Sequence, residues 1–282
     1  MMSAPNRRYS KYMALPRIAA LQPSISIVLE RLDRLDALVA CTRYCVEAIP
    51  ELAGRDVAVI ADSWSTSAEE ILAVSPDLVI ASVPYRQESL TAILKASRPV
   101  LALAPRSLAD IDADIRLLGS LVQASAQAEA LIELMAAERE AIRVRAVATG
   151  HRPLIYCEEW GKPLIHSQLW VRELVELAGG RFLGEPGATT DAATVAAANP
   201  DVLAFAWCGA GDRVPLQRVI DQRQWQHLRA AQNGRVYCIP DEWLNTPAPT
   251  LLDGLRALAA ALHPECFVTP TTMRQLANAV TI

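Results

Sequence analysis

The chain has 282 residues, 52% of them hydrophobic and 21% charged, and a formal net charge of -4. This composition is ordinary for a globular protein, and the length allows one large or two modest domains. The small negative charge does not favour nucleic acid or an anionic membrane surface as a partner, and no stretch approaches the roughly 18 apolar residues expected of a membrane span.

Short apolar strands alternate with helical patterns in the first part of the chain. The expected strands are 18–21, 38–41, 57–61, 78–81 and 100–104, and the expected helices are 24–32, 68–74, 86–96 and one beginning at Ser107. Because these strands are apolar on both faces and alternate with helices, the pattern predicts a parallel sheet covered by helices.

A long helix is predicted near the middle of the chain. The segment 125–148 contains no Gly or Pro and is rich in strong helix formers. At 1.5 Å per residue it would span roughly 35 Å, about the length of a small domain. It has an α/β pattern on each side, so we interpret it as a rigid connection between two lobes.

After Gly150 the alternation starts again. Strands are expected at 154–157, 202–208 and 236–239, helices at 169–178, 192–198 and 248–262, and a terminal helix or a partly frayed segment after Pro264. Both halves contain a short helix, then Ser-Pro-Asp or Asn-Pro-Asp, then an apolar strand, and Pro200 follows Pro76 by 124 positions. Such an echo on both sides of the central helix indicates two related lobes.

The predicted fold is therefore α/β, with two Rossmann-like lobes that contain parallel sheets and are joined by one long backbone helix. The expected parts are an N-terminal lobe (17–106), a helical segment (107–149), a C-terminal lobe (150–265) and a tail (266–282). We expect a monomer.

Polar and aromatic residues gather where the predicted strands end. In parallel α/β sheets, ligands bind outside the carboxyl ends of the strands. Five of the six tryptophans lie at or just beyond such ends, which favours a flat, partly apolar ligand surface. The candidate ligand-binding residues are Tyr44, Trp64, Tyr85 and Arg86 in the first lobe, and Glu159, Trp160, His166, Trp207, Arg213 and Trp243 in the second.

Four of the six cysteines, Cys45, Cys157, Cys208 and Cys238, also lie at or just past a predicted strand end. They are either small packing residues or thiolate ligands for an iron–sulfur cluster or another thiophilic metal, with His166 nearby. The second interpretation gives an alternative function, a cytoplasmic cysteine-ligated metal or iron–sulfur protein with a redox or enzymatic role. No nucleophile–base arrangement or phosphate-binding loop is found, so we expect no catalytic residues and no enzyme.

The N-terminal segment carries basic residues but no apolar run of signal-peptide length, because Pro16 and Arg17 interrupt the stretch 15–21. We therefore expect a cytoplasmic protein, or a periplasmic one if the start codon is misassigned. In the cytoplasm the cysteines would be thiols rather than disulfides.

Several segments, in order and spacing, resemble the class III periplasmic substrate-binding proteins, the cobalamin- and siderophore-binding family, and most closely its cobalamin-binding branch. The matching pieces are IAALQPS at 18–24, EEILAVSPDLV at 69–79, RELVELAGG at 172–180, NGRVY at 233–237 and PAPTLL at 247–252. The resemblance covers nearly the whole chain.

This resemblance implies a non-catalytic protein that holds a corrinoid or related metal chelate between aromatic rings in a cleft between two lobes. Trp64 and Trp243 match ligand-facing aromatic positions of the family, whereas the aromatic expected near Gly187 is missing. Family members deliver their ligand to an ABC transporter permease through one acidic residue on each lobe. Glu69 matches the first of these positions, and the second is Ala193.

Overall fold

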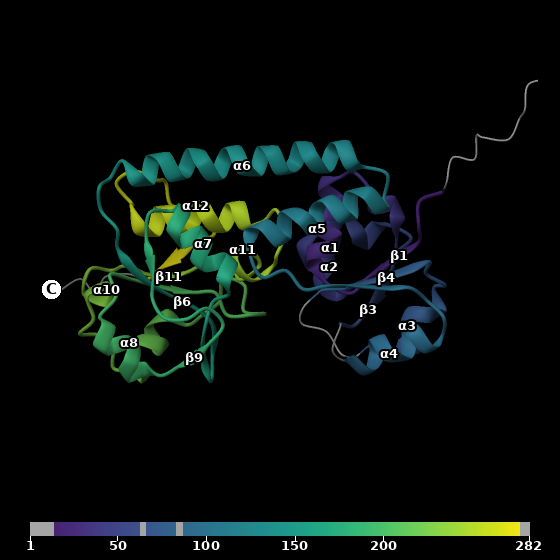
Figure 1. Cartoon of the computed structure of the whole chain (residues 1–282). Helices are drawn as coiled ribbons and strands as arrows, with labels where there is room; N and C mark the ends of the chain where they lie inside the picture. Colours follow the sequence, from purple (N-terminus) through teal and green to yellow (C-terminus); the bar gives the residue numbers. More distant parts are fainter. Residues whose placement is uncertain (1–13, 63–65, 83–86, 277–282) are drawn as a thin grey trace, which may run out of the picture.

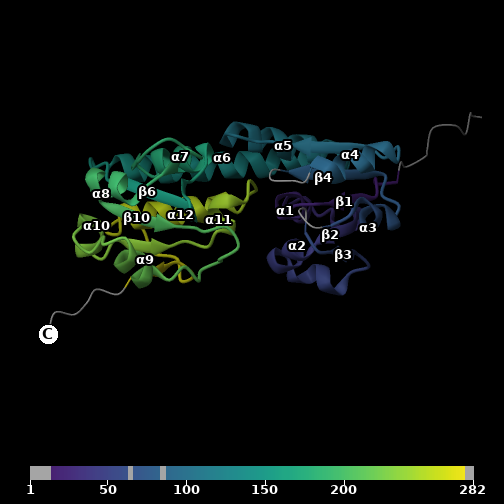
Figure 2. The same cartoon turned by 90° about the horizontal axis from the view of Figure 1, so that it is seen from below.

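The structure is a computed structural model that describes residues 14–62, 66–82 and 87–276. It contains two α/β lobes joined by helices α5 (Leu108–Leu121) and α6 (Ser125–Val147). Helix α6 runs along one side of both lobes (Figure 1), and the view from below shows the lobes side by side (Figure 2). Within the described ranges, no helix combines the length and the apolar character needed to cross a membrane. The predicted two-lobe α/β fold is confirmed.

The first lobe contains a five-stranded sheet, parallel throughout, in the order β3-β2-β1-β4-β5. Its strands are β1 (Ile18–Ala20), β2 (Leu38–Thr42), β3 (Ala58–Ile60), β4 (Leu78–Ser82) and β5 (Val100–Leu103). Its helices are α1 (Pro23–Arg31), η1 (Leu35–Ala37), α2 (Arg43–Ala48), η2 (Pro50–Gly54), α3 (Ala68–Ala73) and α4 (Gln87–Lys95). The residues of β1 alternate between the face covered by α1 and α2 and the face covered by α3 and α4, as strand geometry requires.

The second lobe contains a mixed sheet rather than the purely parallel one that was predicted. Its strands are β6 (Leu154–Gly161), β7 (Leu164–His166), β8 (Arg181–Phe182), β9 (Thr189–Thr190), β10 (Val202–Phe205), β11 (Val236–Cys238) and β12 (Arg274–Gln275). Its helices are α7 (Leu169–Leu177), α8 (Ala192–Ala198), α9 (Leu216–Gln222), α10 (Arg229–Gln232), α11 (Glu242–Asn245) and α12 (Leu251–Leu262). Strands β6, β10 and β11 are parallel, whereas β7, β9 and β12 pair antiparallel with their neighbours.

Two differences from the sequence prediction follow from this mixed sheet. Strand β6 continues to Gly161 and turns back into β7, so Glu159, Trp160 and His166 lie in strands rather than in loops beyond them. The segment after Pro264 contains β12, which adds an antiparallel edge strand to β11 instead of a terminal helix. In the first lobe, Tyr44 lies in α2 rather than in a loop.

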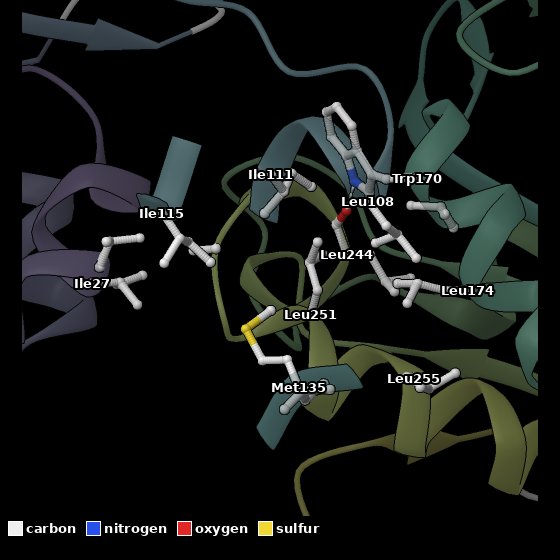
Figure 3. Packing of buried hydrophobic residues seen from close by; sticks show 14 of the residues in the cluster. Ile27, Leu108, Ile111, Ile115, Met135, Trp170, Leu174, Leu244, Leu251 and Leu255 are labelled. Atoms are coloured by element: carbon white, nitrogen blue, oxygen red, sulfur yellow. Dashed lines mark hydrogen bonds between the residues drawn. The ribbon is translucent and has the colours of Figure 1, made fainter. Parts of the chain in front are cut away.

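One hydrophobic core runs through both lobes on the α6 side of the molecule. In Figure 3, Ile111 and Ile115 of α5 lie between Ile27 of the first lobe and Leu251 of the second. Two smaller cores are each confined to one lobe, one beneath α3 and α4 and one beneath α8, α9 and α10. The two lobes therefore pack firmly against each other along one side, because separating them there would expose buried apolar surface.

The sequence echo corresponds to a repeated local structure. Asp77 accepts a hydrogen bond from the backbone N–H of Arg17 at 2.9 Å, and Asp201 accepts one from that of Leu154 at 2.8 Å. In each lobe this bond ties the start of the first strand to the strand after the short helix, β4 or β10. The residue before each Pro-Asp pair has a positive φ, 48° at Ser75 and 45° at Asn199.

Candidate functional site

The strand ends of the first lobe meet the second lobe at a small cavity. Ser24 follows β1 and Ser82 ends β4, and both line this cavity together with Pro247 of the second lobe. Asp114 and Ile111 of α5 also line it, so every part of the junction contributes. The carboxyl ends of parallel strands are where α/β sheets bind ligands, so this cavity marks the floor of the candidate site.

Asp114 places a carboxyl group on the mainly apolar face of α5. Ile111, Ile115 and Leu118 on the same face are buried, and the Asp114 carboxyl has no hydrogen bond or ion pair within the described ranges. Burial, and to a smaller extent the charge of Asp110, raises the pKa of Asp114 to about 6. It is an unpaired acidic group between the lobes.

Three of the predicted tryptophans lie at the strand ends of the second lobe with partly exposed rings. Trp160 is 43% exposed near the end of β6, and its indole N–H donates to the Lys162 carbonyl at 2.9 Å. Trp207 follows β10, and Trp243 lies in α11, and both are half-buried. Trp170 is instead a core residue whose N–H donates to the Leu244 carbonyl at 2.7 Å (Figure 3).

Glu158 is fully buried beneath Trp207 and accepts four hydrogen bonds. The Trp207 indole N–H donates to it at 2.7 Å, the Arg223 guanidinium donates twice, at 2.7 and 2.9 Å, and the Tyr156 hydroxyl donates as well. A buried carboxylate requires such compensation, because burial of an unpaired charge is costly. The indole N–H of Trp207 is one of the four donors in this network.

The loop after Trp207 is held by Asp241, whose carboxylate accepts the backbone N–H groups of Gly209 and Gly211, both at 2.7 Å. Both glycines have positive φ, 77° and 59°, which a side chain would disfavour. The loop carries Arg213, which is exposed and whose guanidinium has no hydrogen bond or ion pair to the described residues.

Glu159 lies at an irregularity of β6, because the pairing with β7 shifts its register between Glu158 and Trp160. Its carboxylate accepts a hydrogen bond from the Gln168 amide at 2.6 Å. Burial raises the pKa of Glu159 to about 7, although the bond from Gln168 opposes this. Cys208 lies close by. The residue as a whole is exposed, but desolvation of its thiol, followed by the charges of Glu159 and Asp241, raises the pKa of that thiol to about 12.

The four candidate cysteines are not brought to one place. Cys157 and Cys238 are buried on opposite faces of the second sheet, and Cys45 is buried in the first lobe, where it contacts the Thr42 hydroxyl at 3.3 Å. Cys208 is exposed and accepts a hydrogen bond from Asn245. No three His, Cys, Asp or Glu side chains within residues 14–62, 66–82 and 87–276 are grouped to hold a metal ion. Of the two interpretations of these cysteines, packing residues fit this arrangement better, because Cys157 and Cys238 pack into different cores on the two faces of the second sheet.

The other predicted residues divide into three groups. His166 is buried, its ring lies 5.3 Å from that of Tyr156, and burial lowers its pKa. Tyr44 is half-buried and accepts a hydrogen bond from Arg43 at 2.9 Å. Trp64, Tyr85 and Arg86 lie outside the described residues.

Glu69 lies exposed in the first turn of α3, and Ala193 is exposed at the matching place in α8. Figure 1 shows both helices on the side of the molecule away from α6.

Sequence reasoning missed Asp114 as a contributor to the site. A signal for Asp114 was present, because an acidic residue between Ile111, Ile115 and Leu118 interrupts the apolar stripe of a predicted helix. Asp241 lies just past the predicted strand 236–239, so it carried the same strand-end signal as the chosen residues.

Comparison with known proteins gives a consistent result. The family model described as "Periplasmic binding protein" matches residues 18–243. An uncharacterized ABC transporter substrate-binding lipoprotein of Bacillus subtilis, YvrC, is 22% identical over 264 residues, which cover 89% of this chain and 81% of that protein. A cobalamin-binding protein of Halobacterium salinarum is 22% identical over 263 residues, 88% of this chain and 69% of that protein. The crystal structure of a periplasmic heme-binding protein from Pseudomonas aeruginosa is similar with a TM-score of 0.80 and 20% identity, over 93% of this chain and 99% of that one.

Proposed function

The chain belongs to the periplasmic binding protein family and is a substrate-binding protein of the ABC-transporter type, and we propose that its ligand is a corrinoid or a closely related metal chelate. Members of this family bind solutes without catalysis. In this proposal, the protein binds its ligand and does not transform it.

The observation that carries the proposal is the set of partly exposed rings at the strand ends of the second lobe: Trp160, Trp207 and Trp243. Aromatic side chains there offer broad, flat apolar surfaces with a polar edge, which suit a large planar macrocycle. The relative from Halobacterium salinarum is named as a cobalamin-binding protein, which supports the same class of ligand.

Heme is the second candidate, because structural relatives with this fold are named as heme-binding proteins. Asp114 lines the cavity between the lobes, and a carboxyl group that reached the ligand from there would favour the corrinoid. A corrinoid presents amide N–H groups, which a carboxylate accepts as hydrogen-bond donors, whereas heme presents carboxylates, which a second carboxylate repels.

Calorimetric titration with cobinamide, cobalamin, hemin and a ferric siderophore tests this proposal, with tryptophan fluorescence followed in parallel. We expect saturable binding of cobinamide or cobalamin with quenching of tryptophan emission, and weaker binding of hemin. Absence of binding by both corrinoids at high micromolar concentration would contradict the proposal.

We further propose that the protein works in the periplasm and docks on a permease through Glu69. Related proteins are named as periplasmic or as a lipoprotein, so the expectation of a cytoplasmic protein is not supported and the periplasmic alternative is. Glu69→Ala should leave ligand affinity unchanged and reduce ligand uptake in cells, while the exposed Glu47→Ala in α2 serves as a control. Equal uptake by both variants would exclude this docking role.

A further inference from the structure

The Trp207 ring is fixed from two sides. From one side, its indole N–H donates to the fully buried Glu158 at 2.7 Å. From the other, the ring covers Gly161, where an added Cβ would come within 2.5 Å of a ring carbon. A glycine is therefore required for the ring to lie as it does, and a buried carboxylate determines its direction.

Arg223 completes this arrangement and is itself restrained. Its guanidinium binds Glu158 through two nitrogens, at 2.7 and 2.9 Å, and lies 4.9 Å from the ring centre of Trp225 and 5.7 Å from that of Phe205. Trp225 is fully buried, and its N–H donates to the Ala192 carbonyl at 3.1 Å. The ion pair is thus anchored in the core beneath α8, α9 and α10 and does not move independently of it.

A buried ion pair contributes little net stability to a fold. Removing two charges from water costs free energy, and apolar side chains of similar volume often serve a core equally well or better. What this ion pair provides is direction, because a carboxylate with three of its hydrogen bonds already fixed has one defined place for the fourth donor. That fourth donor is the indole of Trp207, at the strand ends of the candidate site.

We propose that Glu158, held by Arg223, is a positioning residue that presets the Trp207 ring as a platform for the flat face of the ligand. The ligand-facing role of Trp207 rests on the proposed function. A ring held in place before the ligand arrives loses little conformational freedom on binding, so releasing it should weaken affinity about tenfold.

Fluorine NMR of the whole protein labelled with 5-fluorotryptophan tests the positioning directly. Trp207→Phe identifies the Trp207 resonance among those of the six tryptophans. The test variant is Glu158→Met with Arg223→Met, which removes both charges and also the acceptor for the Trp207 indole N–H. The control is Glu138→Met with Arg256→Met, which removes an ion pair between α6 and α12, where Arg256 also contacts Asp253.

We expect the Trp207 resonance to shift and broaden in the test variant and to stay unchanged in the control. Cobinamide affinity should fall about tenfold in the test variant, and adding Trp207→Phe to it should cause little further loss, because the two changes remove one arrangement. If the test variant does not fold, Arg223→Lys loses the bidentate geometry while keeping the charge, and the same shift is expected at smaller amplitude.

An unchanged Trp207 resonance in the folded variant would overturn the positioning role. A shifted resonance with unchanged affinity would overturn the ligand-platform role of Trp207. If the wild-type protein binds no corrinoid or heme, the proposed function fails, and the NMR spectrum without ligand still confirms or refutes that Glu158 positions Trp207.

Discussion

The two lobes share a structural repeat but differ at the ends of their strands. In both, an aspartate after a proline accepts the backbone N–H at the start of the first strand, at 2.9 Å in the first lobe and 2.8 Å in the second. In the first lobe, β1 leads directly into α1, whereas in the second lobe β6 extends into a hairpin with a buried Glu158. The repeat accounts for the common fold, and the departures from it carry the candidate site.

Replacing Arg223, the cation beneath Trp207, should give the largest difference in stability between the two lobes. Arg223→Met leaves the Glu158 carboxylate buried without its partner and should lower the free energy of unfolding by about 3–5 kcal/mol. Urea denaturation gives the size of this effect. Hydrogen exchange should locate the loss in the second lobe, and equal acceleration in both lobes would contradict a role confined to one.

A glycine in each lobe provides the next comparison. An added Cβ at Gly254 in α12 would lie 2.1 Å from the Trp243 carbonyl oxygen, whereas one at Gly54 in the first lobe meets nothing within 4 Å. Gly254→Ala should therefore destabilise the protein by about 1–3 kcal/mol through overpacking. Gly54→Ala should have little effect in the same thermal or urea unfolding experiment, and equal losses would refute the close contact between α11 and α12.

The shared aspartates can be compared directly. Asp77→Ala and Asp201→Ala each remove a hydrogen bond from a carboxylate to a backbone N–H, which contributes about 1–2 kcal/mol. The effect should be larger for Asp201, because it also pairs with Arg229 at 3.1 Å and is less exposed. The exposed Asp56→Ala is the control in urea unfolding. Losses no greater than that of the control would show that the repeated bonds do not stabilise the lobes.

Asp114 lies between the lobes, and its effect should depend on pH. Its folded-state pKa, about 6, is above the ordinary value of 3.8, so the folded protein favours the protonated carboxyl. The stability that the protonated Asp114 carboxyl contributes is present below about pH 4 and is lost as the pH rises through 6. Because the group is partly exposed, Asp114→Asn should stabilise the protein by about 1 kcal/mol at pH 8 and by almost nothing at pH 4. Urea unfolding at the two pH values measures this, and an effect of the same size at both would contradict the assigned environment.

Local patterns were sufficient to predict the strands of the first lobe, the long helix α6 and the echo around Pro76 and Pro200, because periodicity and turn residues are properties of neighbouring positions. The site required more distant information. The first strand of the second lobe was expected to end at Cys157, yet it continues to Gly161, and Glu158 is buried within it, where Arg223, 65 positions away, neutralises it. The strand pairing also determines the face of the sheet on which each residue lies, and it places Cys157 and Cys238 on opposite faces.

Hydrogen exchange of the wild-type protein with and without cobinamide tests most directly whether a corrinoid lies against the strand ends of both lobes. We predict slower exchange in the segments that follow β1 in the first lobe and β10 and β11 in the second, including the loop from Trp207 to Arg213. The exchange rates of peptides from α6 should be unchanged. Protection confined to one lobe, or found only away from these strand ends, would contradict the account.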